Sequence, residues 1–206
     1  GSRRLRGRFP YGKKAVLSDG GRNGGKPQKE QFAPGAFSYR LNLPGEDIHL
    51  LSGHDYNKPL ASRATDTLKL RDTAEALLFE ADITPQVADT SHGADAIALI
   101  EAGLSVGISP GFRIPPPRAV PPDQAEKITT EAYDPSRRMF GATIRTILAA
   151  LLYELSVVTR PAYQEATIEP VRGDPPAETY QPDREPIDED GDGFDDVTGE
   201  EIVPRQ

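Results

Sequence analysis

The chain has 206 residues, a formal net charge of −8 at pH 7 and no cysteine. This length predicts a single domain with one core, and the lack of cysteine excludes disulfide bonds, thiol catalysis and a cysteine-ligated zinc. No apolar run approaches the roughly 20 residues that a membrane span requires, and no signal peptide opens the chain. The sequence therefore predicts a protein that does not contact a membrane.

The charge is unevenly distributed along the chain. Residues 1–40 carry ten Lys or Arg against two acids, whereas residues 173–206 carry twelve acids against two Arg. The acidic balance and the lack of interleaved aromatic residues argue against sequence-specific nucleic-acid binding. We expect a solvated basic arm over residues 1–10, whose Gly-Ser start without Met is typical of a cleavage remnant, and an acidic, disordered tail over residues 171–206. The domain then occupies residues 11–170.

The N-terminal half of the domain is predicted to form short strands. Ala15–Leu17 is bounded by turn residues and indicates an edge strand, and Ile48 to Gly53 reads as a buried strand. Residues 64–70 and 76–83 are β-like runs around a short polar turn, which is typical of a hairpin. The helical pattern begins only later, where Thr90 or Ser91 can cap a helix that runs through Ala102.

The segment after this helix combines a small apolar strand with two serines and three glycines. In it Leu104, Val106 and Ile108 alternate with Ser105, Gly107 and Ser109, so a strand would point Ser105 away from the core. Glycines on either side of Ser105 would let an extended substrate approach closely, which is what a serine nucleophile needs. The alternative is a strand that merely contains serine. Ser109 and Ser156 are the competing nucleophiles.

The C-terminal half is predicted to contain further strands. The proline-rich stretch 115–122 indicates an extended surface excursion, and residues 127–132 and 138–146 alternate as strands do. The most apolar segment, residues 147–163, contains one acid, Glu154, which is costly to bury unless it is hydrogen-bonded or paired. The alternative is that Glu154 lies on an exposed face of its strand.

The chain has three histidines, and their positions differ in how well they suit catalysis. His49 lies within a predicted strand and His92 at a helix start, where single histidines usually have structural roles. His54 follows Gly53 at a strand end, next to Asp55, and is the best placed for general acid–base chemistry.

The acidic tail contains one motif that suggests a metal. Asp188, Asp190 and Asp192 stand at alternate positions before Gly193, which resembles the start of a calcium-binding loop. However, Gly199 stands where such a loop requires a bidentate Glu, so an acidic tail without metal is the competing interpretation.

Four motifs together resemble the prohead protease family of tailed bacteriophages. They are Phe32-Ala-Pro-Gly-Ala-Phe37, Gly53-His-Asp55 with Pro59-Leu60, Gly103-Leu-Ser-Val-Gly-Ile108, and Leu152-Tyr-Glu-Leu-Ser-Val-Val-Thr-Arg-Pro-Ala162. The resemblance covers about residues 10–170 and departs in the proline-rich insertion and at Ser62-Arg63. It implies a serine endopeptidase, related in fold to herpesvirus assemblin, that acts inside the immature capsid in the host cytoplasm, in a phage or prophage system.

The resemblance also implies residue roles and partners. Ser105 would be the nucleophile, His54 the general base and Glu154 the third member of the triad, and by analogy with assemblin Arg160 would assist the oxyanion. The substrates would be the scaffold protein or the scaffolding segment of the major capsid protein, and the chain itself. No cofactor is expected, and self-association stays open.

The predicted fold is mainly β, an assemblin-like antiparallel β-barrel flanked by a few helices. Two other functions stay open on the sequence alone. One is a catalytically silent scaffold or internal capsid protein. The other is a metal-dependent hydrolase that uses His54, Asp55 and further acids.

Overall fold

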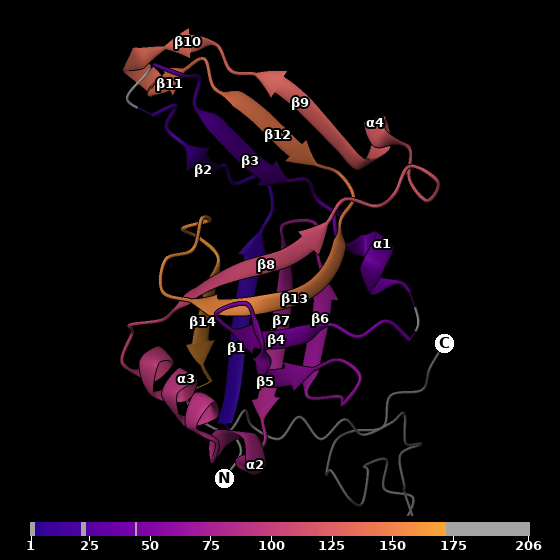
Figure 1. Ribbon diagram of the computed structural model, residues 1–206, viewed down its shortest axis with the longest axis vertical. Helices are drawn as coiled ribbons and strands as arrows, with labels where there is room; N and C mark the ends of the chain where they lie inside the picture. Colours follow the sequence, from indigo (N-terminus) through magenta and orange to yellow (C-terminus); the bar gives the residue numbers. More distant parts are fainter. Residues whose placement is uncertain (1–2, 22–23, 44, 172–206) are drawn as a thin grey trace, which may run out of the picture. The chain divides into compact units, whose positions relative to one another are not determined.

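The computed structural model describes residues 3–21, 24–43 and 45–171, and its largest element is an eight-stranded sheet (Figure 1). Its strands are β1 (Arg3–Pro10), β4 (His49–Ser52), β5 (Asp55–Ser62), β6 (Leu68–Asp72), β7 (Ala76–Ile83), β8 (Gly107–Arg113), β13 (Leu151–Val158) and β14 (Thr167–Pro170). They are arranged in the order β5-β4-β13-β8-β14-β1-β7-β6. Neighbours are antiparallel except β4 and β13, which run parallel. The fold is mainly β and barrel-like, as predicted.

A smaller sheet has the order β2-β3-β12-β9. Its strands are β2 (Ala15–Ser18), β3 (Gln28–Phe32), β9 (Glu126–Thr130) and β12 (Thr143–Ile147). β10 (Tyr133–Asp134) and β11 (Met139–Phe140) form a separate two-stranded ladder, joined by a 3₁₀ turn at Pro135–Arg137. β2 lies at the edge of its sheet, as its short apolar pattern predicted.

The helices are α1 (Ser38–Leu41), α2 (Pro85–Ala88), α3 (Ser91–Glu101) and α4 (Pro122–Ala125). α3 begins where the sequence predicts, because the Thr90 side chain accepts a hydrogen bond from the amide of Gly93. Such a cap satisfies one of the amides that the first turn leaves without a partner. α3 buries Ala96, Ile97 and Ile100. No described helix is long and apolar enough to cross a membrane.

Aromatic side chains join the two sheets in the core. Phe32 packs edge-on against Phe9 of β1, with ring centroids 5.2 Å apart, and stacks on Phe37 at 5.0 Å. Tyr163 meets Phe9 at 4.8 Å and donates its hydroxyl to the buried Glu30 at 2.9 Å. Offset and edge-to-face pairs of this kind add to the stabilisation from burial. The Phe32–Phe37 motif therefore contributes to the core rather than to a site.

The N-terminal segment differs from the sequence-based expectation. Residues 3–10 were expected to lie in a solvated basic arm, but they form β1, which pairs with β7 and β14 near the middle of the sheet. Leu5 and Phe9 are buried on one face, while Arg4, Arg6 and Arg8 are exposed on the other. The four arginines masked this alternation, because composition alone made the segment resemble a charged tail.

The strand that was expected to carry Ser105 begins two residues after it, at Gly107. The amides of both Leu104 and Ser105 donate to the carbonyl of Leu99, so the backbone is still finishing the last turn of α3. The sequence predicted an exposed Ser105 between buried aliphatic neighbours, and the structure shows the opposite. Ser105 is 6% exposed, whereas Leu104 is 62% exposed and Val106 is 40% exposed.

Candidate active site

A group of polar side chains lies on the face of β13 and β8 that points away from the core, which we call the outer face. Leu155 and Val157 of β13 and Ile108 of β8 pack into the core. Because successive side chains of a strand point to opposite faces, Glu154 and Ser156 project to the outer face of β13. Both are nevertheless buried, at 3% and 0% exposure. Buried polar groups on an outer face need partners from another segment.

Glu154 finds its partners within hydrogen-bond distance. One carboxylate oxygen, Oε1, lies 2.6 Å from His54 Nδ1, and the other, Oε2, accepts a hydrogen bond of 2.6 Å from the Ser156 hydroxyl. The pairing of β13 with β8 shifts register between Leu152 and Glu154, which leaves Tyr153 as the extra residue of a β-bulge. Bulges of this kind re-aim side chains. The sequence-based prediction of a partnered, buried Glu154 therefore agrees with its contacts.

His54 is held by the turn between β4 and β5. Ser52 pairs with Asp55, and the two residues between them, Gly53 and His54, have φ angles of 64° and 60°. Two consecutive left-handed residues are what a type I′ hairpin turn requires. Glycine adopts this conformation freely, whereas for His54 it costs roughly 1–2 kcal/mol. Such strain persists where the surrounding structure over-determines it.

Backbone contacts fix this turn against β13. The amide of Gly53 donates to the carbonyl of Val157 at 3.0 Å, and the amide of His54 donates to the Ser156 hydroxyl oxygen at 2.9 Å. Ser156 therefore links the backbone of His54 to the carboxylate that holds its ring. Sequence reasoning treated Ser156 as a competing nucleophile and missed this role. The available signal was its position two residues from Glu154, on the same face of the strand.

The contact of His54 with Glu154 decides the chemistry of the imidazole. When Nδ1–H donates to the carboxylate, Nε2 is left as the basic nitrogen. The His54 side chain is 45% exposed, so this nitrogen is open to an incoming group, whereas the Glu154 side chain is only 4% exposed. A buried carboxylate behind a solvent-facing imidazole is the arrangement of a general base with its orienting acid.

The outer face of β8 is unusually bare beside these groups. A side chain at Gly111, which lies opposite Glu154, would overlap the carboxylate, and one at Gly107 would overlap the ring of Pro161. Between the two glycines, on the same face, stands Ser109, directly opposite Ser156. Ser109 therefore lies opposite the residue that contacts both His54 and Glu154.

The two candidate nucleophiles differ in their distance from this pair. At about 3.3 Å of rise per residue, Ser109 lies about 7 Å along β8 from Gly111, which sits beneath the Glu154 carboxylate, whereas Gly107 lies about 13 Å from it. Ser105 precedes Gly107 and belongs to the turn that follows α3. Neither hydroxyl is hydrogen-bonded to His54 in the described part of the chain. Hydrogen bonds between catalytic groups are often long or poorly aligned until substrate binds.

Aromatic and cationic side chains border the site. Arg40 and Arg113 lie 4.9 Å and 5.9 Å from the centroid of the Tyr153 ring. Burial raises the pKa of the Tyr56 phenol, and the Glu154 charge raises it further, while Arg113 and Arg40 act in the opposite direction. Tyr56 therefore lies close enough to sense all three charges.

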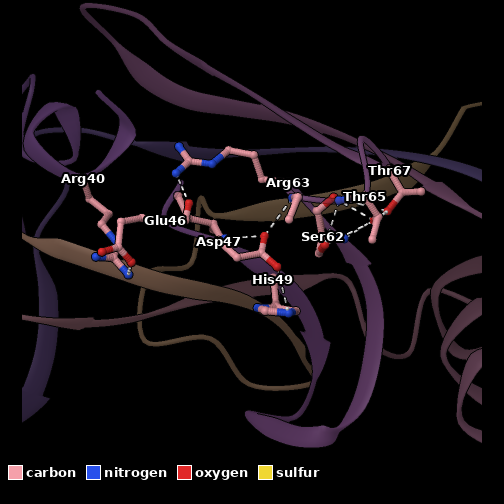
Figure 2. A network of polar contacts seen from close by, with 10 residues as sticks. Arg40, Glu46, Asp47, His49, Ser62, Arg63, Thr65 and Thr67 are labelled. Atoms are coloured by element: carbon pink, nitrogen blue, oxygen red, sulfur yellow. Dashed lines mark hydrogen bonds and ion pairs between the residues drawn. The ribbon is translucent and has the colours of Figure 1, made fainter. Parts of the chain in front are cut away.

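A polar network supports the entrance to β4, as Figure 2 shows. Asp47 accepts hydrogen bonds from the amides of Ile48 and Ala64, at 2.8 Å and 2.9 Å, and pairs with His49 Nε2 at 3.2 Å. Burial acts to raise the pKa of Asp47, but the amides of Ala64 and Ile48 and the neighbouring His49 outweigh it and lower the pKa. Arg63 in turn donates to the carbonyls of Leu41 and Glu46. His49 is thus satisfied locally, as expected of a structural histidine.

The remaining sequence-based site residues are not joined to the His54–Glu154 pair. Asp55 accepts from the amide of Asn57 and pairs with Lys58 rather than with His54. Arg160 is exposed in the loop after β13. The calcium candidates Asp188, Asp190 and Asp192 lie outside the described residues. Within those residues, no group of three or more His, Asp or Glu side chains is arranged to hold a metal.

A comparison with family models identifies the class of protein independently of this geometry. Residues 21–175 match the model described as caudovirus prohead serine protease. This match defines the class of protein as a serine protease of tailed-phage proheads. The chain belongs to the caudovirus prohead serine protease family. No curated protein and no solved structure matches it.

Proposed function

We propose that this chain is a serine endopeptidase that cleaves scaffold protein, or the scaffolding segment of the major capsid protein, and itself. It would act inside the immature capsid, in the host cytoplasm. Family membership supports the class of reaction. The observation that carries the proposal for this chain is the 2.6 Å contact between His54 Nδ1 and the buried Glu154 carboxylate. A solvent-facing imidazole with a buried carboxylate behind it has a chemical role in a protease, as the general base, and none in a catalytically silent scaffold protein.

We infer that Ser109, rather than Ser105, is the nucleophile. Ser109 shares the outer face with Glu154 and stands directly opposite Ser156, which contacts both His54 and Glu154. Ser105 is buried in the turn after α3, before β8 begins. The Gly-x-Ser-x-Gly pattern that favoured Ser105 is therefore weaker support than the register of two strands.

The proposed mechanism follows from these positions. Nε2 of His54 takes the proton from the Ser109 hydroxyl as its oxygen attacks the scissile carbonyl, and Glu154 stabilises the imidazolium that forms. The imidazolium then gives its proton to the leaving amine as the peptide bond breaks. Water, activated by the same imidazole, attacks the acyl ester and releases the second product.

Arg160 remains the proposed oxyanion residue. It follows β13 directly, and the neighbouring Pro161 packs over Gly107, two residues before Ser109. The exposed guanidinium is therefore tethered near the same end of β8. It would stabilise the oxyanion directly or through a water molecule, as a charged donor does in a site from which substrate excludes solvent.

The test is a matched pair of serine variants. Ser109→Ala is expected to lower kcat/KM for cleavage of a capsid–scaffold substrate by about 10³-fold or more, because the nucleophile is lost. Ser105→Ala is expected to remain within about threefold of the wild type. Cleavage would be followed by mass spectrometry of the substrate and of the chain itself.

A serine-directed phosphonylating reagent provides the second readout. It is expected to modify Ser109, with modification abolished in His54→Ala. Modification of Ser105, together with retained activity in Ser109→Ala, would instead restore the sequence-based assignment. Full activity in His54→Ala would overturn the protease mechanism itself and favour the silent scaffold protein. Inhibition by a chelator alone would favour the metal-dependent hydrolase.

A further inference from the structure

A second region of the outer face, away from the candidate active site, carries an unbalanced set of basic side chains. It lies over β14, β1, β7 and β6, and its lining includes Arg6, Arg8, Lys69, Arg71 and Leu78 around a hollow of about 510 Å³. We call it the basic hollow. A hollow of this size exceeds what a single ion fills and suits several side chains of a partner.

The register of the strands explains why cations gather there. Arg8 of β1 lies opposite Leu78 of β7, which lies opposite Arg71 of β6. One row further along, Arg6 lies opposite Glu80, which lies opposite Lys69. Since directly opposed residues project to the same face, the two rows stand side by side on one surface.

The acidic side chains of this face neutralise only some of its basic side chains. Arg6 pairs with Glu169 at 2.7 Å and Arg4 pairs with Asp82 at 3.2 Å. The other row has no acid: Thr167 neighbours Arg8 on β14, and Leu78 separates Arg8 from Arg71. Neither arginine forms an ion pair within the described ranges 3–21, 24–43 and 45–171. Two exposed guanidinium groups therefore remain free to bind anions.

We propose that the basic hollow is a docking surface for an acidic polypeptide segment of a partner protein. Arg8 and Arg71 stand on strands separated by β7, so their spacing is about 10 Å, two inter-strand distances. Carboxylates three residues apart in a peptide of polyproline II conformation lie on the same side with a similar spacing of about 9 Å, because this helix has three residues per turn and a rise of about 3.1 Å per residue. Guanidinium groups bind carboxylates through paired hydrogen bonds, and Leu78 between them provides an apolar contact for the peptide.

Charge complementarity favours a polypeptide over a nucleic acid. A phosphate backbone needs a continuous run of cations, whereas Glu80, Glu169 and Asp82 interrupt this surface and would repel it. An acidic peptide carries carboxylates only at intervals, which can be matched to Arg8 and Arg71. The proposal stands apart from the proposed function, because it requires no catalysis.

The experiment measures binding of a fluorescein-labelled peptide with glutamate at every third position and proline between to the full chain by fluorescence anisotropy. The double variant Arg8→Gln/Arg71→Gln is expected to weaken binding about tenfold or more, because two charged hydrogen-bonding partners are lost. Arg118→Gln/Lys127→Gln removes the same charge from exposed positions elsewhere and is the matched control. It is expected to bind like the wild type. Binding should weaken as salt is added.

Hydrogen exchange on the wild-type chain supplies an independent readout that needs no variant. Addition of the peptide is expected to slow exchange in β6 and at the ends of β1 and β7. Equal loss of binding in both double variants would overturn the proposal, since it would indicate non-specific attraction. Tighter binding of a DNA oligonucleotide through the same arginines would also overturn it and indicate a nucleic-acid partner. Lack of peptide binding at low salt would have the same consequence.

Discussion

Two carboxylates on the outer face of the same sheet have opposite characters. Glu154 contacts His54 at 2.6 Å with its side chain 4% exposed, and Glu169 contacts Arg6 at 2.7 Å with its side chain 59% exposed. The distances are nearly equal, but the surroundings differ. A buried pair is costly to break because one charged group is left without a partner, whereas an exposed pair contributes about 0–1 kcal/mol.

This comparison shows how one sheet supports two kinds of surface. At the candidate active site, Glu154 and Ser156 are buried and hold the half-exposed His54, so the positions of these three residues are interdependent. At the basic hollow, charges are exposed and only partly paired. The first arrangement suits chemistry, which requires fixed geometry. The second suits recruitment, which requires accessible charge.

The largest expected effect is on kcat, and it distinguishes Glu154 from Glu169. Glu154→Gln keeps the size of the side chain but removes the charge that orients and stabilises the His54 imidazolium. We expect kcat to fall by about 10³–10⁴-fold, as when the orienting acid of a triad is neutralised. Glu169→Gln is the matched control, because it removes an ion pair of nearly the same length that is exposed to solvent. It should leave kcat unchanged and shift the free energy of unfolding by less than about 1 kcal/mol. Similar activity of the two variants would contradict the triad.

A smaller effect is expected from filling the bare surface of β8. In Gly111→Ala the new methyl group overlaps the Glu154 carboxylate, which must move away from His54. We expect kcat to fall by about 10²-fold, since displacements of about 1 Å have this consequence at catalytic groups. Arg118→Ala, at an exposed position of the proline-rich stretch, is the control and should retain activity. A crystal structure of Gly111→Ala with the His54–Glu154 contact intact would refute this explanation.

The smallest effect concerns acid stability through Asp47, at the start of β4. Its pKa is lowered in the folded state, so its contribution is present above the unfolded pKa of about 3.9 and is lost as pH falls through the folded value. Asp47→Asn should therefore flatten the decrease in the free energy of unfolding at acidic pH. Urea unfolding at a series of pH values measures this slope. A slope identical to that of the wild type would show that Asp47 does not contribute to it.

Local patterns predicted much of the fold. The helix from Thr90, the hairpin of β6 and β7 and the apolar strand β13 follow from caps, turns and alternation that lie within a few residues of one another. The motifs around His54 and Glu154 also directed attention to the residues that the structure brings together. The N-terminal strand was missed because the arginines of its exposed face dominated its composition.

The sequence by itself determined the kinds of groups available: a histidine after a turn, an acid in an apolar strand and serines near glycine. Only the tertiary structure decided which serine neighbours the other two groups. Ser105 and Ser109 are four residues apart, so a strand pattern of period two places them on the same face and cannot distinguish them. The distinction comes from where β8 begins and how it pairs with β13, more than forty residues later. That register depends on contacts across the whole sheet, which no local pattern contains.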